Sequence, residues 1–208
     1  MAEEQKASGG IWLGMLALMP WLVYAFASGG NHWRVATAGG MLVCIAYLAV
    51  LSRRTTVKLM DWTTLGFFAA ATVIMVGLHS AEFPIYHVVV IWSFFAVAAW
   101  ISIASRKPFT YAYAREQAPP EFWDNPIFHR VNWILGFFWA GLFSVNVGFA
   151  AIGVAVGGNF GKLVPGFLLP TALLIFGFAV SKRFPDFYMA RVQIAPDGSI
   201  SRARRVSA

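Results

Sequence analysis

Six apolar stretches, each long enough to cross a bilayer, occupy most of this 208-residue chain, and they limit its fold more than any other feature. A helix rising 1.5 Å per residue needs roughly 17 to 25 apolar residues to cross a hydrocarbon core about 30 Å thick. Unpaired backbone groups are costly in lipid, and the strict alternation of a barrel strand is missing, so we expect helices. The predicted spans are residues 11–28, 33–51, 59–78, 83–104, 131–156 and 163–180.

The Lys and Arg residues give these spans a direction. All of the 16 cations except Arg34 and Lys162 lie at one set of span ends. Short loops rich in Lys and Arg stay in the cytoplasm, so both termini are predicted to be cytoplasmic. A rival interpretation makes the first span a signal peptide cleaved at Ala25-Phe26-Ala27. The first eight residues carry two Glu and one Lys, which favours a retained helix.

We therefore expect an all-α integral membrane protein with six transmembrane helices arranged as three hairpins. Residues 1–10 would form a cytoplasmic N-terminal segment, and residues 11–183 a single transmembrane domain with a cytoplasmic loop at 105–130. Residues 184–208 would form a basic cytoplasmic tail. A serine followed by two cations closes the second, fourth and sixth spans, which fits three hairpins derived from one unit. The alternative is that membrane topology alone places cations at those ends.

The loop of residues 105–130, between the fourth and fifth spans, is predicted to contain a short interfacial helix. Pro108 suits the start of that helix, and Phe109, Ala112 and Glu116 follow at three- and four-residue spacings that share one face. The predicted lipid- or partner-binding residues are Arg106, Lys107, Tyr113, Arg115, Glu116 and Trp123. The alternative is that the loop only holds its neighbouring helices in place.

The net charge of +7 favours a membrane surface as a partner. Each cation near an anionic leaflet contributes about 1 kcal/mol of attraction to lipid headgroups. A nucleic-acid partner would need a folded basic domain, and the polar segments are too short to form one. We therefore expect anionic lipid headgroups as partners and no nucleic acid.

The few polar side chains deep in the spans are uncharged. Asn132, Asn146 and Thr171 are predicted either to pack helices together or to line a substrate path, and interhelical hydrogen bonds of this kind contribute about 0.6 to 2 kcal/mol. Gly153 and Gly157 would allow close helix approach. Asp, Glu, Lys and Arg are missing from the middle of the spans, which argues against a proton pump or an ion-coupled carrier.

Metal binding and catalysis find little support. His32, His79 and His87 lie at outer ends with Glu82, and they would form a metal site only if their loops converged. We expect no metal and no cofactor. The sequence contains no phosphate-binding loop and no hydrolase or metalloprotease motif, so no catalytic residue is predicted.

A set of short motifs between Ser105 and Pro185 resembles the bacterial intracellular septation protein A family, also called inner membrane-spanning protein YciB. These motifs are Lys107-Pro108, Ala114-Arg115-Glu116, Pro120, Trp123, Asn132-Trp133, Phe137-Phe138, Leu142, Asn146, Phe176 and Arg183-Phe184-Pro185.

The resemblance implies a bacterial inner-membrane protein that supports cell-envelope maintenance or septation through contacts with envelope or division proteins. The family has no established catalytic residues. The leading hypothesis is therefore a non-enzymatic membrane protein that organises partners or lipids through residues 106–123. The alternatives are a small multi-pass transporter or channel with Asn146 and Thr171 along its path, and a membrane-boundary enzyme or a haem or metal protein.

Overall fold

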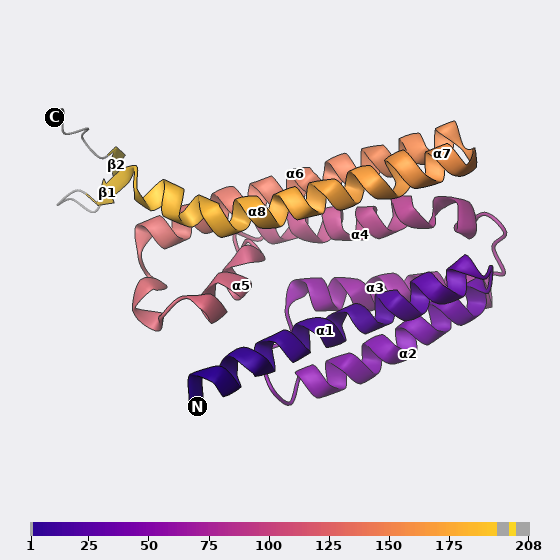
Figure 1. Cartoon of the computed structure of the whole chain (residues 1–208), viewed down its shortest axis with the longest axis horizontal. Helices are drawn as coiled ribbons and strands as arrows, with labels where there is room; N and C mark the ends of the chain where they lie inside the picture. Colours follow the sequence, from indigo (N-terminus) through magenta and orange to yellow (C-terminus); the bar gives the residue numbers. More distant parts are fainter. Residues whose placement is uncertain (1, 195–199, 203–208) are drawn as a thin grey trace. The chain divides into compact units, whose positions relative to one another are not determined.

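The computed structural model describes residues 2–194 and 200–202, and side chains for residues 16–192. The chain divides into two compact units, residues 1–94 and residues 95–208 (Figure 1). We call them the first and the second unit and describe each by itself. The expected charges on Lys6, Arg204 and Arg205 lie outside the described side chains.

The first unit consists of helices and one π-helical turn. Its elements are α1 (Ala2–Gly29), α2 (Trp33–Leu51), α3 (Leu59–Thr72), the π-helical η1 (Val73–Gly77) and the first half of α4 (Phe83–Ala104). The second unit holds the rest of α4 and then α5 (Thr110–Gln117), the 3₁₀ turn η2 (Pro120–Phe122), α6 (Pro126–Val156), α7 (Gly158–Leu163), the π-helical η3 (Val164–Leu168) and α8 (Leu169–Met189). Two short antiparallel strands, β1 (Val192–Ile194) and β2 (Ile200–Arg202), follow α8.

Five helical segments in the described part of the chain are long and apolar enough to cross a membrane. They are Trp33–Leu51, Leu59–Gly77, Phe83–Ala104, Pro126–Val156 and Gly158–Met189. Large apolar side chains on them face outward, for example Ile175, which is 67% exposed, and Phe178, which is 65% exposed. This pattern is that of a helical, multi-pass membrane protein. The described apolar part of α1, Leu16–Gly29, is shorter than these five segments. The first predicted span, residues 11–28, therefore stays a prediction.

The last helical segment differs from the predicted sixth span. It runs from Gly158 to Met189 rather than from 163 to 180, and it passes through the predicted domain boundary at residue 184. Two of its three prolines lie where a helix accepts them, Pro165 in η3 and Pro170 in the first turn of α8, whereas Pro185 lies inside α8. The N–H group of Leu169 donates to the carbonyl of Val164, five residues earlier, which makes the turn π-helical.

Aromatic side chains fill the core of the first unit. Phe67 and Phe68 are fully buried, and Trp21 stacks on Phe67 with ring centroids 5.4 Å apart. Gly40 on α2 gives Phe68 its space, because a Cβ atom at residue 40 would lie 2.3 Å from the Phe68 ring. The only cysteine of the chain, Cys44, is buried in the same core.

Backbone contact between glycines joins the helices of the second unit. A Cβ atom on Gly153 of α6 would lie 2.7 Å from the carbonyl oxygen of Gly161 in α7 and 3.1 Å from the nitrogen of Gly166 in η3. Further along the same helix pair, the indole N–H of Trp139 donates to the hydroxyl of Ser181 at 2.8 Å. Residues of α6 therefore pack against α7, η3 and α8 along its length.

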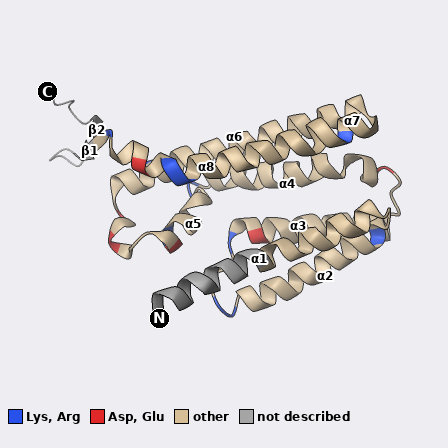
Figure 2. Cartoon of the chain, in the orientation of Figure 1, with Lys and Arg blue, Asp and Glu red and all other residues tan. Residues whose placement is uncertain are grey.

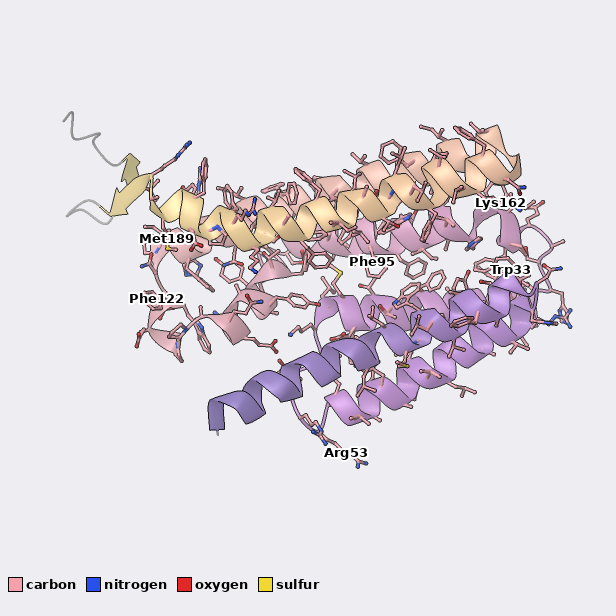
Figure 3. All side chains as sticks on the ribbon, viewed as in Figure 1. Trp33, Arg53, Phe95, Phe122, Lys162 and Met189 are labelled. Carbon is pink, nitrogen blue, oxygen red and sulfur yellow. The ribbon has the colours of Figure 1, made fainter. Side chains whose placement is uncertain are left out.

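Charged residues gather at helix ends in both units (Figure 2). In the first unit, Arg53 and Lys58 lie between α2 and α3, at the opposite end of α2 from Arg34. Figure 3 labels Trp33 and Arg53 at these two ends. In the second unit, Lys162 and Met189 mark the two ends of the last helical segment (Figure 3). The middle parts of α2, α4 and α6 carry no described Lys, Arg, Asp or Glu (Figure 2).

Candidate functional site

The loop between α4 and α6 starts with a tight turn that fixes its first residues. Arg106 adopts a left-handed conformation with φ of 57°, and the N–H group of Lys107 donates to the carbonyl of Ser102 at 3.0 Å. The hydroxyl of Ser102 accepts a bond from the N–H group of Phe109 at 3.2 Å. Pro108 then lies directly on α6, because a Cβ atom at Gly136 would be 2.9 Å from the Pro108 Cβ.

The inner face of α5 is tied to the start of α6. The buried hydroxyl of Thr110 donates to the carbonyl of Asn132 at 2.8 Å. One helical turn earlier in α6, His129 Nδ1 is hydrogen-bonded to the hydroxyl of Tyr111. Burial raises the pKa of Tyr111, and the nearby charge of Arg115 opposes that change more weakly, so this hydroxyl is neutral at physiological pH. The short helix is therefore anchored through its own side chains.

The side chains of Arg115 and Trp123 contact each other near the C-terminal end of α5. The guanidinium carbon of Arg115 lies 5.1 Å from the centroid of the Trp123 ring, and the Trp123 N–H donates to the carbonyl of Ala118 at 3.1 Å. Pro119 and Pro120 reverse the chain between them and begin the η2 turn. The sequence predicted Arg115 and Trp123 as members of one lipid- or partner-binding set, and the structure brings the two side chains together.

The outer surface of this loop is exposed and carries both signs of charge. Arg106, Lys107, Arg115 and Glu116 are exposed, and Tyr113 is half-buried against Phe109. Residues 105–130 contain four cations and three carboxylates, so their net charge is only +1. Exposed Phe122, labelled in Figure 3, adds an apolar contact point at the η2 turn. We call residues 105–125 the α5 loop.

The two buried amides of α6 differ in their hydrogen bonding. Asn132 is 2% exposed, and its side-chain nitrogen donates to the carbonyl of Phe128 at 2.9 Å. Asn146 is fully buried, and neither its side-chain oxygen nor its nitrogen has a partner. Thr171 is half-buried in the first turn of α8 and is not hydrogen-bonded to Asn146. The structure therefore does not join Asn146 and Thr171 as a polar pair.

The three histidines of the first unit lie near helix ends. His87 Nδ1 lies 2.9 Å from the carbonyl of Pro84, and the His87 ring packs on Trp33 with centroids 4.8 Å apart. His79 Nδ1 lies 3.1 Å from the carbonyl of Gly77, while His32 is exposed. Among the residues that the structure describes, no three His, Cys, Asp or Glu side chains are grouped to hold a metal.

A groove on α8 is the feature that the sequence interpretation missed. It has a volume of about 340 Å³ and is lined by Phe176, Ala179, Val180, Arg183, Phe184 and Phe187. These residues follow helical spacing through Pro185, where the predicted span had already ended. Continuing the helical pattern past that proline would have revealed the face.

Comparisons with known proteins leave the family open. Neither a scan of protein-family models, nor a search of curated proteins, nor a search of solved structures gave a match to this chain.

Proposed function

We propose that this chain is a six-span bacterial inner-membrane protein, built as three hairpins with both termini in the cytoplasm, that holds a partner protein on its α5 loop. The role class is the one implied by the resemblance to the septation protein A family, namely cell-envelope maintenance or division. The cations support the orientation, because the turn between α2 and α3 and the α5 loop are both richer in Lys and Arg than the opposite helix ends.

The observation that carries this proposal is the two-sided construction of the α5 loop. Its inner face is held by the Thr110–Asn132 and Tyr111–His129 bonds, while its outer face presents the exposed cations Arg106 and Lys107. Arg106 and Lys107 contact no carboxylate in the described part of the chain. A pre-ordered surface loses little conformational entropy when a partner binds, which favours association.

The mixed charge of the loop favours a protein over a lipid surface as its partner. An anionic leaflet attracts segments with a clear surplus of cations, whereas the α5 loop has three cations and three carboxylates and so no net charge. The exposed carboxylate of Glu121 would be repelled by phosphate groups but can pair with a cation of a protein. Exposed Phe122 adds the aromatic type of side chain that is enriched in protein interfaces.

Site-specific photocrosslinking in native membranes tests the proposal. A photoreactive amino acid is placed at Glu116 or at Phe122 in the full chain, and a matched control carries it at Ile152, which is exposed on the apolar face of α6. We expect both loop positions to capture the same protein and the control to capture none of it. Adducts to lipid alone, or identical adducts from all three positions, would reject a protein partner at the α5 loop.

A second candidate function, a small transporter, is favoured by one observation, the unpartnered amide of Asn146. A buried amide of this kind can offer hydrogen bonds to a polar solute that enters the helix bundle. Solute uptake into proteoliposomes that is lost in Asn146→Leu but kept in Asn132→Leu would support transport. Equal uptake by both variants would reject a path through Asn146.

A further inference from the structure

The groove on α8 combines an apolar floor with a cationic end. Its lining residues recur at three- and four-residue intervals from Phe176 to Phe187, so they share one face of the helix. Ala179 is the smallest of them and leaves the hollow between the rings of Phe176 and Phe184. Phe176 is 56% exposed and Phe187 is 50% exposed, so the groove opens outward.

Two guanidinium groups flank the last ring of this groove. Arg183 is part of the lining, and the guanidinium carbon of Arg191 lies 3.8 Å from the centroid of the Phe187 ring. Both arginines are exposed, and neither is paired with a carboxylate of the described chain. Stacking on Phe187 restricts Arg191 to one orientation while its N–H donors remain available.

Toward the C-terminal end of α8, the apolar lining is joined by the arginines, just as the acyl chain of a phospholipid ends in its phosphate headgroup. Seven residues separate Phe176 from Arg183, which corresponds to about 10 Å along the helix axis. The apolar part belongs to the hydrophobic segment Gly158–Met189, and the arginines lie toward the end of that segment where Lys182 also lies. A phosphate at that end accepts charge-assisted bonds from guanidinium forks, while a hydrocarbon chain fits between the phenyl rings.

We propose that this face of α8 binds one anionic glycerophospholipid, with its phosphate at Arg183 and Arg191 and one acyl chain along Phe176, Ala179 and Phe184. The charge on this face excludes a second copy of the chain as the occupant, because a two-fold contact would bring like guanidinium groups toward each other. The site uses no residue of the α5 loop, so it stands independently of the proposed partner contact.

Native mass spectrometry of the full chain in mild detergent tests this site. The protein is titrated with phosphatidylglycerol or with phosphatidylcholine carrying the same acyl chains, and the lipid-bound fraction is measured. Arg183→Gln and Arg191→Gln remove the proposed headgroup donors. Lys182→Gln is the matched control, because Lys182 is exposed on the same helix but does not line the groove.

We expect Arg183→Gln to weaken phosphatidylglycerol binding roughly tenfold, which is the effect of losing one charge-assisted hydrogen bond. Lys182→Gln should change that affinity by less than about twofold, since an exposed cation contributes little. Phosphatidylcholine, whose choline cation offsets the charge of its phosphate, should bind the unchanged protein less tightly than phosphatidylglycerol and should lose less affinity in Arg183→Gln. Equal weakening by Lys182→Gln and Arg183→Gln would overturn the site in favour of diffuse attraction.

A second pair of variants tests the acyl-chain part without changing charge. Ala179→Phe fills the groove, and Ala155→Phe places the same ring on an exposed position of α6 that does not line it. We expect only Ala179→Phe to weaken lipid binding, with selectivity for phosphatidylglycerol retained in both. Unchanged binding in Ala179→Phe, or a dimer that Ala179→Phe abolishes, would overturn the proposal.

Discussion

The two units of this protein are packed by opposite means. In the first unit, side chains fill the space between helices, and Phe67 and Phe68 contribute rings that are fully buried. In the second unit, Gly153 of α6 meets the backbone of Gly161 and Gly166 directly. In lipid, close helix contact is made either by interlocking large side chains or by small residues that let backbones touch. The second solution leaves less freedom to adjust, because backbone moves only with its helix.

Gly161→Ala should have the largest effect of the changes that probe this contrast. Its new Cβ atom would lie 2.4 Å from the carbonyl oxygen of Gly153, and both atoms belong to helical backbone. We expect a loss of about 3 kcal/mol in unfolding free energy, at the upper end of overpacking effects. Thermal unfolding in one detergent, followed by circular dichroism, measures it. Gly148→Ala on α6 is the control, because nothing lies within 4 Å of its new Cβ atom. Equal melting temperatures would contradict the claim of rigid backbone packing.

Gly40→Ala probes the side-chain-packed unit and should have a smaller effect. The Cβ atom would lie 2.3 Å from the ring of Phe68, which must turn away within a filled aromatic core. We expect a loss of about 2 kcal/mol, since a ring can shift where backbone cannot. Gly66→Ala serves as its control, with a nearest contact of 3.6 Å to Phe94. A larger loss than in Gly161→Ala would reverse the contrast between the units.

Asn146→Leu should raise stability, whereas most substitutions of buried residues lower it. The amide has no hydrogen-bond partner, so replacing it with an apolar side chain of similar size removes a desolvation penalty. We expect a gain of about 1 kcal/mol in the same thermal assay. Asn132→Leu should instead lose stability, because its side chain donates to Phe128. A loss in Asn146→Leu would show that this amide is bonded in the membrane.

Thr110→Val tests the attachment of the α5 loop and should have the smallest global effect. The substitution keeps the shape of the side chain but removes the bond to the carbonyl of Asn132. We expect about 0.5 kcal/mol of lost stability, at the low end for one hydrogen bond. Hydrogen exchange of residues 110–117 should become faster while exchange in α2 stays unchanged. Exchange that is unaltered in α5 would mean that the remaining contacts hold the loop alone.

The helices that sequence predicted best are those with sharp polar boundaries. The bounds of α2 and α4 agree with the predicted spans 33–51 and 83–104, because polar or turn-forming residues flank each apolar run. The last segment was placed less well, because Lys182 and Arg183 end the apolar run although the helix continues to Met189. The same segment contains the π-helical turn Val164–Leu168, which packs against α6 and has no local sequence signal.

Predictions about the candidate site were limited for a similar reason. The short helix of residues 110–117 follows from Pro108 and the spacing after it, and the exposure of Arg106 and Lys107 follows from their charge. The contact of Arg115 with Trp123 could not be predicted, because it depends on a chain reversal at Pro119 and Pro120. Gly153 was expected to allow close approach, but its neighbours are Gly161 and Gly166, while Gly157 ends α6 with φ of 68°.

The enclosed thiol of Cys44 makes the protein convenient for chemical mapping of its membrane sidedness. Because this is the only sulfhydryl group and it is shielded in the first unit, a membrane-impermeant maleimide has no native target in the folded protein. A cysteine introduced at an exposed position near a helix end, such as Ser52 or Asn159, would then be the sole labelling position. Comparing intact cells with inverted vesicles would report the compartment that each position faces, with no need to remove a natural residue first.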